Sequence, residues 1–327
     1  MRLSSIDASL EGTDMIKPIK HSASVTLALL LAFHSLVALA QGSAVRLNKA
    51  IELFENNETA FGLLSFDYSL NNARSLSRSG LDFIIVDMEH APFDVERIRQ
   101  FLLGMTDKRA ILEKGNLQPN VVPFVRIPAI GSEDVLSQVK QALDVGAYGV
   151  MFPSINNAAE AEMAVRASRY PQLNGVDDYE PEGLRGRNPS NAVWYWGIRD
   201  YHAKADVWPL DPNGELLAII QIETPEGVAN IEEIISVPGT GVIFIGPSDL
   251  STSMGYASSS EPAVEAAIQT VLAACLDHDV PCAITTNSRT VEQRIEQGFR
   301  FVTVGLDGGL SRGAQDALER GRAATGR

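Results

Sequence analysis

The stretch Gln221-Ile222-Glu223-Thr224-Pro225-Glu226-Gly227 follows an apolar run that starts at Leu216. Phe244-Ile245-Gly246-Pro247-Ser248-Asp249-Leu250 repeats the pattern further along the chain. Each stretch predicts a buried strand that leads into a carboxylate, which is Glu223 in the first and Asp249 in the second. In a parallel α/β sheet both acids would lie at the C-terminal edge of the strands, where ligands bind.

These two acids indicate a metal site. Two carboxylates that face one point repel each other unless a cation lies between them. Oxygen ligands that leave room for water and substrate suit Mg²⁺ or Mn²⁺. Glu223 and Asp249 are therefore candidate ligands of a divalent metal ion. The alternative is that each acid only caps the next helix, which explains either acid alone better than it explains the pair.

The rest of the chain alternates apolar, strand-like runs with amphipathic helical segments. Several runs are apolar without alternation, as strands covered on both faces are. Eight β/α repeats predict an α/β fold of the (β/α)8 TIM-barrel type. We expect this domain over residues 44–312 and a polar C-terminal tail over 313–327. The predicted strands are 61–66, 83–87, 121–127, 149–153, 216–223, 241–246, 282–286 and 301–305.

Composition excludes some partners. The 327 residues carry a net charge of −14 and are 45% hydrophobic, which is ample for a core. The acidic balance argues against nucleic acid, because phosphate-binding surfaces need a basic stripe, and against an anionic membrane. A small anionic substrate remains compatible, since the field of a site can oppose the net charge.

The N-terminus has the pattern of a secretory signal peptide. Residues 15–21 are basic, residues 25–39 are apolar, and Ala38-Leu39-Ala40 offers a cleavage site before Gln41. We expect residues 1–40 to be an upstream extension and signal peptide that are removed on export to the periplasm. No stable membrane span would then remain, because the apolar run is short for a spanning helix. An uncleaved N-terminal anchor is the alternative.

The positions of the cysteines and lysines argue against a zinc site and against a Schiff-base lysine. Cys275 and Cys282 are expected to be buried thiols, and no Cys/His cluster in the sequence has zinc spacing. No lysine lies in or at the end of a predicted strand, which disfavours a Schiff-base mechanism.

Further ionisable residues lie at the ends of the second and third predicted strands. His90 follows Asp87 closely and is a candidate general base, since histidine titrates near neutral pH. Arg126 lies near the end of a buried strand and needs an anionic partner. Glu89, Glu223 or a substrate oxyanion could supply it. Together these residues predict a site for an anionic oxo-acid and a divalent cation, where Arg126 shares the charge of an enolate.

Two predicted loops are long, 106–120 and 171–214. The second holds many aromatic residues, namely Trp194, Tyr195, Trp196, Tyr201 and Trp208. A loop of this length without secondary structure is uncommon unless it has a function. It could pack over the barrel wall, form a subunit contact, or act as a lid over the site.

Taken in order, six motifs resemble the HpcH/HpaI aldolase/citrate lyase family over about residues 60–309. They are Asp87-Met88-Glu89-His90-Ala91-Pro92, Val125-Arg126, Leu143-Asp144-Val145-Gly146-Ala147, Arg169-Tyr170-Pro171, Gln221-Ile222-Glu223-Thr224 and Ile245-Gly246-Pro247-Ser248-Asp249-Leu250. The resemblance implies a barrel of the pyruvate/phosphoenolpyruvate superfamily and a class II, metal-dependent aldolase. Such enzymes reversibly cleave a 4-hydroxy-2-oxo acid to pyruvate and an aldehyde. It also implies a homo-oligomer, a hexamer or trimer, and a cytoplasmic location as the alternative to export.

The resemblance also implies roles for individual residues. Glu223 and Asp249 would bind the metal, with Gln221 beside the bound substrate. Arg126 would contact the keto oxygen. His90 would be the acid/base group, oriented by Asp144 and supported by Asp87. The backbone at Ser248 and Asp249 would hold the pyruvate carboxylate.

Two other functions fit the same motifs. An acyl-CoA lyase of the malyl-CoA or citryl-CoA type would use the same metal and enolate. It would need basic residues for the CoA phosphates, and the candidates are Arg185, Arg187 and Arg199. A non-catalytic exported protein that binds an oxo-acid is the other alternative, although a binding protein has no need of a base such as His90.

Overall fold

A computed structural model describes residues 45–129, 135–175, 179–306 and 310–327 of the chain. The predicted signal peptide lies outside these residues. Residues 46–327 form one compact unit. Within the described residues, no helix combines the length and the apolar character that crossing a membrane requires.

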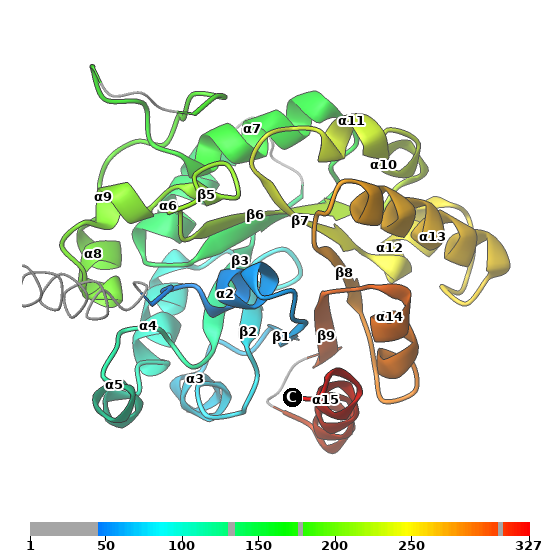
Figure 1. The fold of residues 1–327 in the computed structure, drawn as a ribbon, viewed down its shortest axis with the longest axis horizontal. Helices are drawn as coiled ribbons and strands as arrows, with labels where there is room; N and C mark the ends of the chain where they lie inside the picture. Colours follow the sequence, from blue (N-terminus) through cyan, green and yellow to red (C-terminus); the bar gives the residue numbers. More distant parts are fainter. Residues whose placement is uncertain (1–44, 130–134, 176–178, 307–309) are drawn as a thin grey trace, which may run out of the picture. The chain divides into compact units, whose positions relative to one another are not determined.

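Eight parallel strands close into a barrel that helices surround (Figure 1). The order β4-β3-β2-β1-β9-β8-β7-β6 closes on itself because β4 also pairs with β6. The strands are β1 (Ala60–Ser65), β2 (Phe83–Asp87), β3 (Val122–Arg126), β4 (Gly149–Phe152), β6 (Leu216–Ile222), β7 (Thr240–Ile245), β8 (Cys282–Thr285) and β9 (Phe301–Leu306). The predicted TIM barrel is confirmed, and each strand boundary differs from its prediction by at most one residue.

Several helices start at a side chain that caps them. Asn48, Ser69, Asp94, Asn157 and Thr224 each accept a hydrogen bond from a first-turn backbone N–H group. The helices are α2 (Lys49–Glu55), α3 (Leu70–Leu76), α4 (Val95–Gly104), α5 (Lys108–Lys114), α6 (Val135–Asp144), α7 (Ala158–Ser168), α8 (Ser190–Trp196), α9 (Tyr201–Lys204), α10 (Pro225–Ala229), α11 (Ile231–Ile235), α12 (Pro247–Ser253), α13 (Pro262–Asp277), α14 (Val291–Gln297) and α15 (Arg312–Thr325).

The barrel interior changes in character from one end to the other. At the N-terminal end, the ring of Phe83 stacks on Phe301 with centroids 3.7 Å apart and lies 6.1 Å from Phe124. Gly62 makes room for this stack, since a Cβ there would lie 2.2 Å from the Phe83 ring. Asp87 lies four residues beyond Phe83 on β2, so alternation points it to the same, inward side at the C-terminal end. Aromatic side chains therefore fill the N-terminal end of the barrel, and polar side chains line its C-terminal end, which is called the mouth below.

Helix α2 covers the N-terminal end of the barrel (Figure 1). Phe54 on this helix packs against Phe301, with ring centroids 5.8 Å apart, and against Trp208 at 6.0 Å. Asn48 fixes the start of the helix, because its side chain caps the backbone N–H of Ala50 and donates to the carbonyl of Glu215 at 3.0 Å. Ligands consequently have access to the barrel from the opposite end.

The two long loops predicted from sequence contain secondary structure. Residues 106–120 hold α5, and residues 171–214 hold α8, α9 and the short strand β5 (Val207–Trp208). The second segment joins the end of α7 to the start of β6, so it belongs to the N-terminal end of the barrel. Its Trp196 stacks on Tyr148 with centroids 4.3 Å apart and donates to the carbonyl of Gly146 at 2.9 Å. It packs on the barrel wall at the end opposite the predicted site, so it is not a lid over that site within one subunit.

The C-terminal segment, predicted as a polar tail over 313–327, is held on the barrel. Helix α15 packs there and buries Ala317 and Leu318. Arg322 near its end and Arg327 beyond it both reach a buried carboxylate on the neighbouring strand connection. The polar residues of this segment therefore tie it to the barrel.

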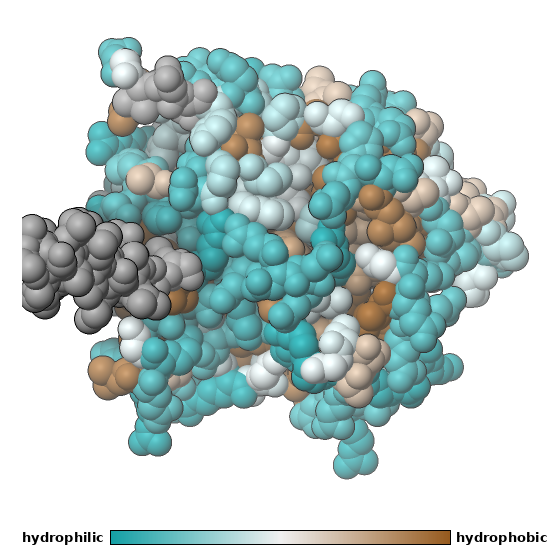
Figure 2. Space-filling model, in the orientation of Figure 1, coloured by the Kyte–Doolittle hydropathy of each residue, from teal (hydrophilic) through white to brown (hydrophobic). Residues whose placement is uncertain are grey.

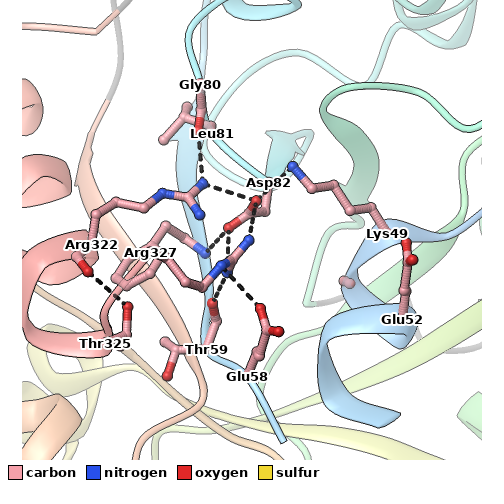
Figure 3. Close-up of polar contacts among 12 residues, drawn as sticks. Lys49, Glu52, Glu58, Thr59, Gly80, Leu81, Asp82, Arg322, Thr325 and Arg327 are labelled. Atoms are coloured by element: carbon pink, nitrogen blue, oxygen red, sulfur yellow. Dashed lines mark hydrogen bonds and ion pairs between the residues drawn. The ribbon is translucent and has the colours of Figure 1, made fainter. Parts of the chain in front are cut away.

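That carboxylate belongs to Asp82, which is fully buried just before β2 (Figure 3). Asp82 Oδ1 lies 2.8 Å from Lys49 Nζ, 2.9 Å from Arg322 Nη2 and 3.3 Å from Arg327 Nη2. Burial favours the neutral acid, but the ion pairs with Lys49 and Arg322 outweigh burial and lower the pKa of Asp82. One carboxylate thus joins α2, the barrel and the C-terminal segment.

The surface is mostly hydrophilic on the face drawn in Figure 2, with hydrophobic residues in small separate groups. Exposed large hydrophobic residues include Leu112 on α5, which is 82% exposed, and Trp194 on α8, which is 71% exposed. Cys275 and Cys282 are buried free thiols, as expected.

We predict that Asp82→Asn lowers the free energy of unfolding by about 2–4 kcal/mol, because it leaves cations without their shared counter-ion. Since the pKa of Asp82 is lowered in the folded state, its contribution is fully present above the unfolded pKa of about 4 and is lost as the pH falls through the folded value. Urea denaturation at several pH values measures both effects. Asp279→Asn, at an ion pair whose carboxylate is 91% exposed, is the control and should change little; a similar loss in both variants would contradict the prediction.

Candidate active site

The C-terminal ends of β2 and β3 bring Asp87 and Arg126 together. These residues pair in register as the last residues of the two strands. Arg126 Nε donates to Asp87 Oδ1 at 2.9 Å, and Nη2 donates to Asp87 Oδ2. The Asp87 side chain is fully buried and that of Arg126 is 6% exposed. The anionic partner that the sequence required for Arg126 is therefore chiefly Asp87.

His90 and Glu89 complete a cluster around the same guanidinium group. His90 Nδ1 lies 2.8 Å from Arg126 Nη2, and Glu89 Oε2 lies 3.1 Å from Arg126 Nη1. Asp87 Oδ1 also accepts the backbone N–H of Glu89 at 2.8 Å, which fixes the turn that carries His90. Because the guanidinium can only donate, the neutral His90 accepts at Nδ1 and carries its proton at Nε2.

Within this cluster, Glu89 is the residue whose pKa is raised strongly. Burial raises its pKa, Arg126 opposes the rise, and the negative charge of Glu223 adds to it, so that the pKa of Glu89 is about 7. A carboxylic acid in this state exchanges protons near neutral pH, as active-site acids often do. From the sequence, Glu89 was predicted only as a possible partner of Arg126.

Glu223 lies across the barrel mouth from this cluster and is held on two sides. Its Oε1 accepts from Ser154 Oγ at 2.7 Å, and its Oε2 accepts from Gln221 Nε2. Gln221 Oε1 is buried and has no hydrogen-bond partner among the described residues. A buried acceptor of this kind suits a water molecule or a substrate group, which agrees with the expected place of Gln221 beside a bound substrate.

Glu223 and Asp249 interact as like charges. Burial raises the pKa of Glu223 above its ordinary value, and the carboxylate of Asp249 contributes to the rise. Gly246 lets the chain pass close to this group, since a Cβ there would lie 2.8 Å from both Gln221 Nε2 and Glu223 Oε2. Neither acid is a helix cap: Thr224 caps α10, and Asp249 lies within the first turn of α12.

Two sets of side chains could hold a cation. Oxygen and nitrogen atoms of Asp87, Glu89 and His90 lie within 4.8 Å of one another. However, all three already contact the guanidinium of Arg126, which supplies the positive charge. Glu223 and Asp249 have no cationic partner as close among the described residues, and a divalent cation would relieve their repulsion.

The first turn of α12 is suited to an anion. Gly246 precedes this helix, and among the described residues no side chain caps it. The backbone N–H groups near Ser248 and Asp249 are therefore open to a ligand, as at other uncapped helix starts. This agrees with the expected binding of a substrate carboxylate at these residues.

Asp144 does not join His90 within the chain. It is the last residue of α6, before β4, and therefore lies at the N-terminal end of the barrel. There it accepts from Lys140 Nζ and, at 2.8 Å, from Arg185 Nη2. The prediction that Asp144 orients His90 was wrong for a single subunit.

Sequence reasoning missed Ser154, which positions Glu223. Its backbone has φ 56°, in the left-handed region that non-glycine residues rarely adopt. Asn156 supports this turn by donating to the Ser154 carbonyl at 2.8 Å. Only the proximity of a serine to the end of a predicted strand, 149–153, could have indicated it.

Several known proteins are similar to this chain. The HpcH/HpaI aldolase/citrate lyase family model matches residues 67–314. A 4-hydroxy-2-oxo-heptane-1,7-dioate aldolase of Shigella boydii is 36% identical over 259 residues, which cover 78% of this chain and 86% of that relative. A 5-keto-4-deoxy-D-glucarate aldolase of Citrobacter koseri is 32% identical over 246 residues, or 74% of this chain and 84% of the relative.

A solved structure is also similar. It is that of an HpcH/HpaI aldolase/citrate lyase family protein from Burkholderia cenocepacia, which is 32% identical to the chain. The match covers 79% of this chain and 91% of that protein, with a TM-score of 0.66.

We predict that Mn²⁺ binds about tenfold more tightly at about pH 8 than at about pH 6. As the pH rises through about 7, Glu89 becomes charged and adds a negative charge near Glu223. Mn²⁺ titration followed by electron paramagnetic resonance measures the affinity at both pH values. Glu89→Gln should remove most of this difference. The exposed control Glu113→Gln should keep it; a pH dependence that is the same in both variants would refute the assignment.

Proposed function

This chain belongs to the HpcH/HpaI aldolase/citrate lyase family and is a carbon–carbon lyase, and we propose that its reaction takes place at the C-terminal mouth of the barrel. The reaction is the reversible, metal-dependent cleavage of a 4-hydroxy-2-oxo acid to pyruvate and an aldehyde. The observation that carries the proposal is the pairing of a guanidinium–imidazole cluster with two mutually repelling carboxylates at one barrel end.

The residues present fit a divalent cation. Glu223 and Asp249 would hold Mg²⁺ or Mn²⁺, and the open acceptor Gln221 Oε1 would face the bound water or substrate. When bound, the cation supplies a Lewis acid that polarises the 2-oxo group. Uncapped N–H groups at the start of α12 would hold the substrate carboxylate, so that the oxo-acid is oriented at both ends.

The bond changes follow from this placement. Loss of the proton from the 4-hydroxyl group forms the aldehyde carbonyl while the bond between C3 and C4 breaks. The electron pair of that bond becomes the enolate of pyruvate, which is then protonated at C3. His90 is the group that accepts and returns the proton, and Arg126 stabilises the enolate oxygen.

Protonation of His90 is coupled to Arg126. Since Nε2 of the neutral His90 already carries a proton, the incoming proton binds at Nδ1, which can then no longer accept from Arg126. One N–H of Nη2 becomes free as the enolate gains charge, while the other stays on Asp87 Oδ2. The imidazolium is stabilised by Asp87 Oδ2 at 3.3 Å and by Glu89 Oε2 at 3.7 Å from Nδ1. Proton transfer to the base His90 thus also frees Arg126 to donate to the enolate oxygen.

The experiment that tests the function is an assay of pyruvate release from a panel of 4-hydroxy-2-oxo acids, coupled to lactate dehydrogenase. We predict turnover that depends on Mg²⁺ or Mn²⁺ and falls to background in Glu223→Gln and Asp249→Asn. The matched control is Glu226→Gln, an exposed acid on the neighbouring helix, which should keep full turnover. Full activity in either metal-ligand variant would show that the site is assigned wrongly.

The same assay separates catalysis from binding at His90. His90→Asn should lower kcat about 100-fold or more, because general acid–base catalysis contributes factors of this size, with KM changed little. A chain that only binds an oxo-acid would show no turnover with any substrate of the panel, in the wild type or in the variant.

The acyl-CoA alternative loses its structural support. Arg185, Arg187 and Arg199 all lie in the segment between α7 and β6, at the end of the barrel opposite Glu223. Arg185 is also buried and paired with Asp144. These arginines are therefore not at the mouth where a CoA phosphate would accompany the reacting acid.

We propose that the chain forms a homo-oligomer, a hexamer or trimer. Exposed Trp194 on α8 and Leu112 on α5 support this, because large exposed apolar side chains favour protein contacts. Sedimentation equilibrium should give a multiple of the subunit mass, and Trp194→Glu should shift it towards the monomer. A monomer at all concentrations would contradict the proposal.

We also propose export with cleavage between Ala40 and Gln41. The support is the basic and apolar pattern of the N-terminal sequence alone. N-terminal sequencing of the native protein should begin at Gln41, whereas an intact Met1 in a cytoplasmic fraction would exclude export.

A further inference from the structure

A large cavity lies outside the candidate active site. It has a volume of about 1000 Å³ and is lined by residues between α7 and β6 and in α9. Tyr170, Arg185, Arg187, His202 and Lys204 bring polar or charged groups to its wall. Because these residues connect a helix end to a strand start, the cavity lies at the N-terminal end of the barrel, away from Glu223.

Arg185 has unused hydrogen-bonding capacity on this wall. The residue is 1% exposed, and its Nη2 donates to Asp144 Oδ1 at 2.8 Å and to the hydroxyl of Tyr201 at 3.0 Å. Its Nε and Nη1 are buried with no hydrogen-bond partner among the described residues. Buried donors without acceptors are costly, so an acceptor from outside the chain would stabilise this arrangement.

Tyr170 lies against the same guanidinium group. Its ring centroid is 4.5 Å from Arg185 Cζ, which is the geometry of a cation–π contact. The Tyr170 hydroxyl is also buried and has no hydrogen-bond partner in the part of the chain that the structure describes. Three polar atoms from two residues of one wall therefore lack acceptors or donors.

The charge around the cavity favours an anion. Among the lining residues, Arg187 contacts only the neutral ring of His202, with Nε 3.0 Å from its Nε2, within the described residues. Of the carboxylates nearby, Asp206 is occupied by the buried Arg169 at 2.6 Å and 2.8 Å. Among the described residues, the remaining acid in the lining is Asp211.

The groups around Arg185 and His202 also carry excess positive charge. Asp144 is shared by Lys140 and Arg185, so this pair of cations exceeds its counter-ion by one charge. Burial lowers the pKa of His202, and the charges of Arg187 and Arg185 lower it further. A protein with a net charge of −14 thus has a locally cationic cavity.

Part of the lining is apolar and aromatic, and it is formed by Pro171, Leu173 and Tyr179. Leu173 is 71% exposed. A ligand that combined an anionic head with an apolar body would meet the cationic and the apolar parts of the lining together.

We propose that this cavity binds a small organic anion, with its carboxylate or phosphate oxygens on Arg185, Arg187 and the Tyr170 hydroxyl and its apolar body against Pro171 and Leu173. Charged oxygens suit guanidinium donors. The site is separate from the proposed aldolase centre and does not depend on it, since neither Glu223 nor Arg126 contributes to it.

The test is a titration with benzoate and with phenyl phosphate, which share a ring and differ in the anionic head. Ring signals of the histidines in long-range ¹H–¹⁵N spectra report the place of binding, at constant ionic strength in chloride buffer. We expect a saturable shift of the His202 signals, with those of His278, directly after helix α13, unchanged. The head group with the lower dissociation constant identifies the ligand class.

Variants make the result specific. Arg187→Gln should weaken binding about tenfold, as loss of a charge-assisted hydrogen bond does. Tyr170→Phe should weaken it without lowering the melting temperature of the free protein, because the lost hydroxyl has no partner there. Arg199→Gln, an exposed arginine of the same segment outside the cavity lining, is the matched control and should bind like the wild type.

Three outcomes would overturn the proposal. They are the absence of a saturable His202 shift with both anions, a shift of His90 without one of His202, and unchanged affinity in both Arg187→Gln and Tyr170→Phe. The second would place the anion in the aldolase centre.

Discussion

Arg126 and Asp87 end neighbouring strands at paired positions, and the ion pair that they form there is buried. Neither charge could remain at this depth without the other, because removal of one partner from such a pair typically costs about 3–5 kcal/mol. The pair also holds His90, through Nδ1, and the backbone of Glu89. The ion pair that lets both charges be buried at the ends of β2 and β3 therefore also fixes the position of the proposed base, His90.

The C-terminal end of the barrel holds more carboxylates than cations, and this excess negative charge explains the electrostatics of Glu89 and Glu223. One guanidinium serves both Asp87 and Glu89, and Glu223 and Asp249 add two more carboxylates with no comparable cation among the described residues. The raised pKa values of Glu89 and Glu223 follow from burial and from this excess. A divalent cation bound there would restore the charge balance where the proposed enolate forms, so the proposed catalysis and the stability of these buried carboxylates would require the same ion.

The sequence was sufficient to predict the barrel strands and the residues at their C-terminal ends. Apolar runs predicted the eight barrel strands, and the C-terminal edge rule brought Arg126 and Glu223 to one mouth. The same rule, applied to helix-to-strand connections, would have placed Asp144 and residues 171–214 at the opposite end. Ser154 depends on a left-handed backbone conformation that no sequence pattern showed. The C-terminal segment looked like a polar tail because its contacts are arginine ion pairs.

Proton exchange at the methyl group of pyruvate tests the central claim most directly, because it needs no knowledge of the aldehyde. The protein is incubated with pyruvate in D₂O, with Mg²⁺ or Mn²⁺, and the methyl signal is followed by NMR. The account predicts loss of that signal only with the metal, and no loss in Glu223→Gln. Exchange that persists in the variant, or its absence in the wild type with either metal, would contradict an enolate-forming centre at this end of the barrel.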